Sequence, residues 1–287
     1  MDTNLETLLA NFVEYLKKSK KSTFTILSYS NDLSQLISFL KERRIAQINS
    51  VSSQDIEDFK SSLENKKYTP KSVFRKLNSI RSFFRWLKNE KIIKEDPSLT
   101  VTYPKIKPSI PRVLTETEYR ALRDAVREDA RMALVVELLL QTGMRIGELE
   151  RLQLDDFSEK EIRIRAYETN PERTVPLNSA IKKALVRWLN IRPKTENKFL
   201  LVTKTGRPFL VRNIRASLQR YLKKAGIKNA SVHSLRHTFI VHQLAAGVPI
   251  PLVQKVVGHR SVTTTEKYLE FVPKTINNSI PNNLEEL

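Results

Sequence analysis

Residues 233–268 read HSLRHTFIVHQLAAGVPIPLVQKVVGHRSVTTTEKY, and this stretch decides how the second half of the chain is interpreted. The chain reads as helical throughout it, and Gly247 and Gly258 stand where helices are expected to end. All 4 histidines of the chain fall within the stretch, which random placement would rarely produce. It therefore predicts a run of helices that gathers chemically versatile side chains.

Several polar side chains of this region suit phosphate chemistry. His233 and Arg236 are three residues apart, so they share one face of a helix. Arg145 follows a Thr-Gly turn and begins another helix. A guanidinium pairs with two phosphate oxygens and stays charged, and phosphoryl transfer depends mostly on positioning and neutralisation. Tyr268 is then a candidate nucleophile, whose usual pKa of about 10 calls for a base or a positive field.

These residues also have ordinary structural interpretations. A tyrosine on a helix is usually a core residue, and an arginine after a turn is usually a surface or capping residue. His233 and His237 are four residues apart, as in helical zinc sites, but Ser234 stands where the metalloprotease pattern needs glutamate. The pattern therefore favours a site without a metal.

The composition indicates a polyanionic partner. The 287 residues include 50 lysines and arginines against 31 acidic residues, for a net charge of +19. Nucleic acid is the commonest such partner, with an anionic membrane surface as the rival. No basic amphipathic helix, lipid anchor, signal peptide or membrane span is evident, so we expect a cytoplasmic protein. The absence of cysteine excludes disulfides and thiolate chemistry.

The N-terminal third, residues 1–103, reads as a bundle of helices. Capping signals begin at Thr3, at Ser52, and at Thr69, which Pro70 follows. The helix after Thr69 carries a row of basic residues opposite its apolar side: Lys71, Arg75, Lys76, Arg81, Arg85 and Lys88. A solvated face is the ordinary interpretation, but so uniformly positive a row favours contact with DNA phosphates.

A proline-containing linker over 104–114 separates this bundle from a second domain over 115–273, which a capping box at Thr115 begins. Alternating or short apolar runs predict strands at 162–166, 174–177 and 199–202. The expected fold class is mainly α with a small β-sheet (α+β), with a tail over 274–287.

Three segments together resemble the active-site boxes of the tyrosine recombinase (phage integrase) family. Thr142–Leu149 matches a Thr-Gly-Leu-Arg box that ends in Glu-Leu. His233–Thr238 matches His-x-x-Arg-His-Thr, and Gly258–Tyr268 runs from Gly-His to a tyrosine nine residues past the histidine. Each box is a moderate signal, but three in order on a basic chain are a strong one. The resemblance covers nearly the whole chain and is closest to compact, Xer-like members.

The resemblance implies a helical core-binding domain and a catalytic domain that clamp DNA like a C. It also implies site residues: catalytic Arg145, His233, Arg236, His259 and Tyr268, with Glu148 as a support. The arginines would bind the scissile phosphate, His233 would assist proton transfer, and His259 would hydrogen-bond the phosphate. Tyr268 would form the 3′-phosphotyrosine bond.

The implied function is site-specific recombination, in which DNA strands are cleaved and rejoined without a metal or nucleotide cofactor. The implied partners are double-stranded DNA with a specific core site and either further copies of this chain, four on two sites, or a related recombinase. The tail over 274–287 would contact a neighbouring protomer. Chromosome-dimer resolution and mobile-element integration both fit.

One departure from the family lies in the hairpin. The family places a lysine there, thought to protonate the leaving 5′ oxygen, at a position that falls near Glu168, and no lysine occurs over 162–175. A lysine from elsewhere, or electrostatic compensation, would replace it; the candidates are Lys160, Lys204, Arg165 and Arg173. Otherwise cleavage is slow or abolished, and the chain is a DNA-binding protein on a recombinase scaffold. A relaxing topoisomerase is a third alternative.

Overall fold

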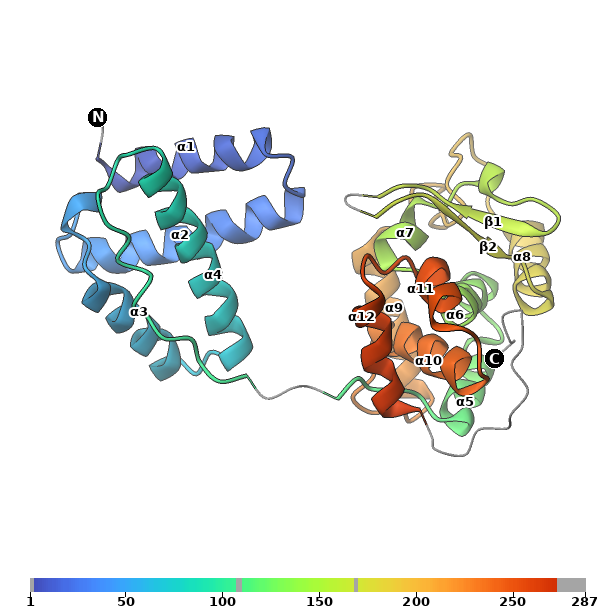
Figure 1. Cartoon of the computed structure of the whole chain (residues 1–287). Helices are drawn as coiled ribbons and strands as arrows, with labels where there is room; N and C mark the ends of the chain where they lie inside the picture. Colours follow the sequence, from blue (N-terminus) through green and yellow to red (C-terminus); the bar gives the residue numbers. More distant parts are fainter. Residues whose placement is uncertain (1–2, 107–109, 168–169, 273–287) are drawn as a thin grey trace. The chain divides into compact units, whose positions relative to one another are not determined.

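The chain divides into two compact units, Met1–Ser109 and Ile110–Leu287, each with its own hydrophobic core (Figure 1). The computed structural model describes residues 3–106, 110–167 and 170–272. The boundary between the units falls inside the linker expected over 104–114. The tail over 274–287, expected to contact a neighbouring protomer, lies outside the described residues. In the described part of the chain, no helix is long and apolar enough to cross a membrane.

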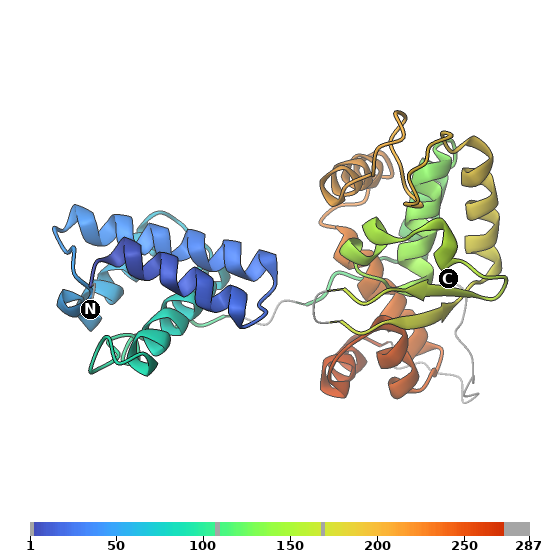
Figure 2. The ribbon, with the colours of Figure 1, turned by 90° about the horizontal axis from the view of Figure 1, so that it is seen from above.

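The N-terminal unit is a bundle of α1 (Leu5–Lys18), α2 (Thr23–Glu42), α3 (Ser53–Asn65) and α4 (Pro70–Asn89), with a 3-10 turn η1 at Ile48–Ser50. Helices α1 and α2 pack side by side (Figure 2). The predicted caps at Ser52 and Thr69 are confirmed, with Pro70 in the first turn of α4. Helix α1 is capped by Asn4 rather than Thr3, because the Asn4 carboxamide oxygen reaches the N–H groups of Glu6 and Thr7.

The C-terminal unit is also mostly helical. Its elements are α5 (Glu116–Val126), α6 (Ala130–Thr142), α7 (Ile146–Arg151), η2 (Leu154–Asp156), β1 (Glu161–Ile164), β2 (Arg173–Pro176), α8 (Ser179–Ile191), α9 (Val211–Lys224), α10 (Val232–Ala245), α11 (Ile250–Val257), α12 (Val262–Glu266) and η3 (Lys267–Phe271). The expected capping box at Thr115 is present. Helix α6 lies at the centre and packs against α8 and α10, while α10 packs against α11 and η3 (Figure 1).

The small sheet is an antiparallel hairpin of β1 and β2, in which Ile162 pairs with Val175 and Ile164 with Arg173. The expectation of a strand over 199–202 was wrong. Phe199 and Val202 each form a single isolated bridge, with two different partners, so no continuous ladder develops. Three of the apolar residues that suggested a strand, Leu200, Leu201 and Val202, are buried in the core of this unit instead.

Candidate active site

A tight turn between α6 and α7 positions Arg145. Helix α6 ends at Gly143, whose φ of 59° lies in the left-handed region. A Cβ at this position would come within 2.5 Å of the Phe239 ring, so only glycine fits without displacing that ring. Arg145 is the N-cap residue of α7, and its backbone N–H donates to the Glu148 carboxylate at 2.8 Å. The Thr-Gly-Met-Arg sequence is therefore a turn that aims Arg145.

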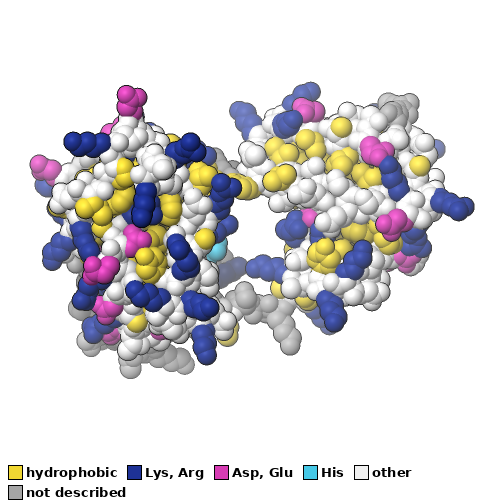
Figure 3. Space-filling model, turned by 180° about the vertical axis from the view of Figure 1, so that it is seen from behind, with side chains coloured by type: hydrophobic (Ala, Val, Ile, Leu, Met, Phe, Trp, Pro, Cys, Tyr) yellow, Lys and Arg dark blue, Asp and Glu magenta, His cyan; other side chains and the backbone are white. Residues whose placement is uncertain are grey.

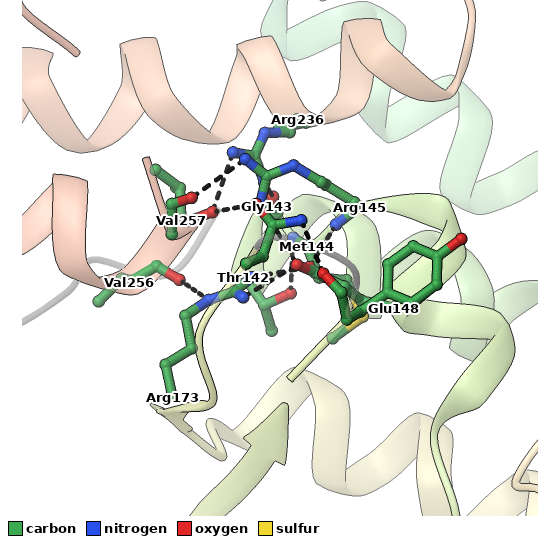
Figure 4. A network of polar contacts seen from close by, with 12 residues as sticks. Thr142, Gly143, Met144, Arg145, Glu148, Arg173, Arg236, Val256 and Val257 are labelled. Atoms are coloured by element: carbon green, nitrogen blue, oxygen red, sulfur yellow. Dashed lines mark hydrogen bonds and ion pairs between the residues drawn. The ribbon is translucent and has the colours of Figure 1, made fainter. Parts of the chain in front are cut away.

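Glu148 is the buried centre of a polar network (Figure 4). Its two carboxylate oxygens accept hydrogen bonds of 3.0 and 2.7 Å from the guanidinium of Arg173, and the Arg145 guanidinium lies 3.3 Å away. Burial alone would raise the pKa of Glu148, but the hydrogen bonds and charges of Arg173 and Arg145 outweigh it and hold that pKa below its usual value. Glu148 therefore stays ionised and orients both arginines.

Three guanidinium groups converge on the carbonyls at the C-terminal end of α11. Arg173 donates to Val256 O at 2.7 Å, and Arg145 to Gly258 O at 3.0 Å. Arg236 donates to Val257 O at 2.9 Å and also to Gly143 O (Figure 4). The carbonyls carry the negative end of the helix dipole, which holds the cations in place.

Arg145 and Arg236 form an anion-seeking pair. Burial and the nearby charge of Arg145 lower the pKa of Arg236 to about 9. The Arg145 side chain remains 30% exposed, so it can still meet a ligand from outside. The two positive charges repel one another. A phosphodiester bound between them would relieve that repulsion, because its oxygens would accept hydrogen bonds from both guanidinium groups.

Tyr268 lies beside the arginine pair, on η3, within a group of histidines. Its hydroxyl is 2.7 Å from Nδ1 of His237, and its ring centroid is 6.1 Å from that of His259. The Nδ1 atom of His259 is in turn 2.9 Å from the Thr265 hydroxyl, which orients the ring. His233 lies one turn before His237 on α10, with ring centroids 6.5 Å apart.

The electrostatics join these groups into one site. Burial raises the pKa of the Tyr268 hydroxyl, and the charge of Arg236 opposes that rise. Burial, followed by the charges of Arg236 and Arg145, lowers the pKa of His259 to about 3. Burial also lowers the pKa of His233, with further contributions from Arg215, Arg236 and Arg145. The histidines are therefore neutral near pH 7 and can accept or donate hydrogen bonds.

The fold thus brings together the five predicted catalytic residues, Arg145, His233, Arg236, His259 and Tyr268, with Glu148 beneath them. Two residues were missing from that predicted set. His237 was considered only as a possible metal ligand beside His233 and as part of the His-Thr end of its box, and Arg173 only as a candidate for charge compensation. Tertiary packing gives each a direct contact in the site.

The candidates for replacing the hairpin lysine are otherwise engaged or distant. Arg165 pairs with Asp155 and Asp156, and Arg173 holds Glu148. Lys204 lines a surface cavity with Ala130 at the beginning of α6, about 18 Å along that helix from the site at its end. Position 168, where the family lysine would fall, lies outside the described residues.

Lys160 also stands apart from the site. Its carbonyl accepts from the N–H of Leu177, at the end of the hairpin away from Arg173. Arg173 is therefore the only one of the four candidates that contacts a predicted site residue through a hydrogen bond within the described part of the chain. Since it is committed to Glu148 and Val256, it supplies fixed positive charge rather than a mobile proton.

No group of three or more His, Cys, Asp or Glu side chains that could hold a metal ion occurs in residues 3–106, 110–167 and 170–272. His233 and His237 share a face of α10, but His237 is directed at Tyr268.

The expected basic face of α4 needs correction at two positions. Lys76 is buried, because its ammonium group donates to Asp32 at 2.9 Å and to Gln35 at 2.7 Å. Arg81 donates to three backbone carbonyls of the segment after α4 and stacks on the Tyr103 ring at 4.1 Å. Both side chains hold the unit together rather than face a ligand.

The remaining members of the row are exposed to different degrees. Arg75 also pairs with Asp32, with about half of its side chain exposed. Lys71 and Arg85 are exposed and stay candidates for DNA contact. Lysine and arginine side chains are spread over the visible surface of both units (Figure 3).

Two family models match the chain. The phage integrase family model matches residues 112–273, and the phage integrase N-terminal SAM-like domain matches residues 9–91. The chain therefore belongs to the phage integrase family of tyrosine recombinases, enzymes that cleave and rejoin DNA. The predicted family, fold class and enzyme class are confirmed.

Its relatives narrow the resemblance. The chain is 31% identical to tyrosine recombinase XerC of Anoxybacillus flavithermus, over 92% of this chain and 93% of that protein. It is 32% identical to a tyrosine recombinase of Pseudothermotoga lettingae, over 98% and 100%. Among solved structures, XerA recombinase is 30% identical with a TM-score of 0.52, over 95% and 94%. A lambda integrase dimer bound to a COC′ core site shares the fold, with 17% identity and a TM-score of 0.79, over 96% and 81%.

Proposed function

We propose that this protein is a site-specific, Xer-like recombinase that uses Tyr268 as its nucleophile. The observation that carries the proposal is the meeting of the Tyr268 hydroxyl, a histidine at 2.7 Å and the Arg236 guanidinium in one half-buried site. A lone buried tyrosine needs none of these neighbours. A tyrosine that attacks phosphorus needs an acceptor for its proton and positive charge for the phosphate.

The arrangement of this chain's residues supports a complete cleavage step. Arg145 and Arg236 would bind the two non-bridging oxygens of the scissile phosphate, and His259 would donate to the same group. The Tyr268 oxygen attacks phosphorus, and the P–O5′ bond breaks with its electron pair on the 5′ oxygen, which takes up a proton. The product is a 3′-phosphotyrosine. Attack by a 5′ hydroxyl of another strand reverses the step, so no external energy source is needed.

The proposed partners are duplex DNA with a specific core site and other protomers. Two solved structures with a similar fold are a lambda integrase dimer bound to a core site and a lambda integrase tetramer bound to a Holliday junction. By analogy, four copies of this chain, or two copies with a related recombinase, would act on two sites. We further propose that the protein acts on this DNA in the cytoplasm.

One observation favours a second candidate, a recombinase-like protein that binds DNA but cleaves it weakly. The sequence has no lysine over 162–175, and Arg165 is neutralised by Asp155 and Asp156. The leaving 5′ oxygen would then lack a dedicated acid. Water would have to protonate it, which slows cleavage of an ordinary phosphodiester.

The test starts with a duplex that the protein selects from a random-sequence pool. A nick in this duplex next to the scissile phosphate traps the cleaved strand, and an adduct that survives SDS is scored on a gel. We expect an adduct with the wild type and none with Tyr268→Phe. A 5′-bridging phosphorothiolate, whose sulfur leaves without an acid, separates the two candidates. An adduct only on that substrate supports the weakly cleaving protein, and no adduct on either contradicts the nucleophile.

A further inference from the structure

The hydroxyl of Tyr268 has one hydrogen-bond partner in the described part of the chain, and it is His237. The Nδ1 atom of His237 is 2.7 Å from the hydroxyl oxygen, and the two ring centroids are 5.6 Å apart. The histidine assigned to proton transfer by resemblance, His233, stands one helical turn earlier and makes no such bond. The contact therefore singles out a residue outside the predicted catalytic set.

Packing fixes His237 in this position. Its neighbour Arg236 is held by the carbonyls of Gly143 and Val257, and its other neighbour, Thr238, accepts from the N–H of Leu114 at 2.8 Å. Helix α10 is thus anchored on both sides of His237, and η3 packs directly against it. The histidine and Tyr268 are a preorganised pair, since neither has to move to form the bond.

The groups around His237 keep its ring neutral. On its own helix they are His233 and Arg236; Tyr268 faces it from η3, and His259 from the turn before α12. Burial, followed by His233 and Arg236, lowers the pKa of His237 to about 4. A neutral imidazole with its proton on Nε2 leaves Nδ1 free to accept from the Tyr268 hydroxyl.

We propose that His237, rather than His233, is the catalytic base that takes the proton of Tyr268 as its oxygen attacks the phosphate. This inference rests on the proposed function. The O–H bond of Tyr268 breaks as the O–P bond forms, and the proton goes to Nδ1 of His237. The P–O5′ bond breaks, and the 5′ oxygen takes a proton from water. In the reverse step the leaving tyrosine oxygen recovers its proton from His237.

A bound phosphodiester makes this transfer easier. Its negative charge, placed between Arg145 and Arg236, offsets the positive field that helps to lower the pKa of His237. The base therefore becomes stronger when the substrate is in place, and stays neutral without it. His233, which also feels the charges of both arginines, would then be available to hydrogen-bond the phosphate.

The test uses His237→Gln, His233→Gln and, as a matched control outside the site, His242→Gln on the same helix. A glutamine oxygen can accept the tyrosine hydrogen bond but cannot take the proton, so it separates positioning from proton transfer. Adduct formation is timed in single turnover on the 5′-bridging phosphorothiolate duplex between pH 6 and 9. Melting temperature and DNA affinity are measured for each variant.

We expect His237→Gln to bind DNA like the wild type and to form the adduct at least about 100-fold more slowly at pH 7. The rate of His237→Gln should rise with pH, because Tyr268 must then lose its proton to hydroxide or water instead of to a histidine. The wild-type rate should not change between pH 6 and 9. Added imidazole should partly restore the rate of His237→Ala. His242→Gln should match the wild type.

Other outcomes overturn the inference. A His237→Gln rate equal to the wild type, or one lowered equally at every pH, would show that His237 only positions Tyr268. A rate that rises with pH in His233→Gln but not in His237→Gln would show that His233 is the base. If the wild type forms no adduct on this duplex, the proposed function itself fails, which is a distinct result.

Discussion

Arg173 holds Glu148 through two hydrogen bonds of 3.0 and 2.7 Å, and both side chains are buried. The pair joins the first residue of β2 to the first turn of α7, and Arg173 extends to the Val256 carbonyl. The hairpin is thereby tied to both segments that position Arg145 and Arg236, the arginines proposed to bind the phosphate. Stability and cleavage are therefore expected to depend on the same ion pair.

Breaking this pair should destabilise the C-terminal unit. Arg173→Ala leaves Glu148 buried with only part of its hydrogen bonding, and we expect a loss of about 3–5 kcal/mol in the free energy of unfolding. The matched control is Arg163→Ala on β1, which removes a half-exposed guanidinium from the buried Asp156 carboxylate. Because Asp156 keeps its shorter contact with Arg165, this change should cost less than about 1 kcal/mol. Urea unfolding measures both. Equal losses of unfolding free energy in the two variants would show that the buried Arg173–Glu148 pair stabilises the protein no more than an exposed contact does.

The same carboxylate should make stability depend on pH. The pKa of Glu148 is lower in the folded protein than its usual value, so the folded state binds its proton less readily than the unfolded state does. Its contribution is fully present above the unfolded pKa of about 4.3 and is lost as pH falls through the folded pKa. Urea midpoints between pH 7 and pH 3 should fall less steeply in Glu148→Gln than in the wild type. Parallel curves would contradict this role.

A side chain at Gly258 should crowd the Arg173 guanidinium. The φ of Gly258 is +68°, and a Cβ would stand 3.0 Å from the Arg173 guanidinium. Gly226 has a similar φ of +72° with nothing within 4 Å, so Gly226→Ala isolates the backbone cost of about 1 kcal/mol. We expect Gly258→Ala to lose more stability than Gly226→Ala, and to slow adduct formation where Gly226→Ala does not. Identical losses would mean that Arg173 simply moves aside.

The exposed members of the α4 row should contribute to DNA affinity, and the buried one should not do so directly. Lys71→Ala or Arg85→Ala should each reduce the slope of log affinity against log salt by about 1 and leave the melting temperature unchanged. Lys76→Ala should instead lower the melting temperature, because it leaves Asp32 buried with one cation fewer. Fluorescence anisotropy across salt concentrations gives the slopes. An unchanged slope in both exposed variants would remove this helix from the interface.

Local chemistry explains what could be predicted from the sequence. The caps at Ser52, Thr69 and Thr115 depend on side chains three residues from the amides they satisfy, so the residue pattern alone predicts them. The hairpin was predictable from the alternation of apolar and basic residues. The three boxes, with Tyr268 nine residues past His259, were enough to predict the family.

The residue pattern could not predict which long polar side chains are exposed and which are buried. The row on α4 looked uniformly exposed, yet Lys76 is buried because α2 places Asp32 against it. Helical spacing assigns a residue to a face but does not say which neighbouring element supplies a counter-charge. Phe199–Val202 failed as a strand for a related reason, since a strand requires a continuous partner and this segment meets two different ones.

The sequence by itself determined the family, the mainly helical fold and the set of residues that we propose to bind and attack a phosphate. Tertiary structure alone decided how these residues touch. His233 and His237 lie one turn apart on the same helix, and either would satisfy the pattern. The packing of η3 against α10 brings the Tyr268 hydroxyl to His237. The packing of the hairpin against α11 brings Arg173 to the Val256 carbonyl, where it also pairs with Glu148 of α7. Contacts between segments so far apart in the chain arise from the burial of their shared apolar surfaces, which no local motif records.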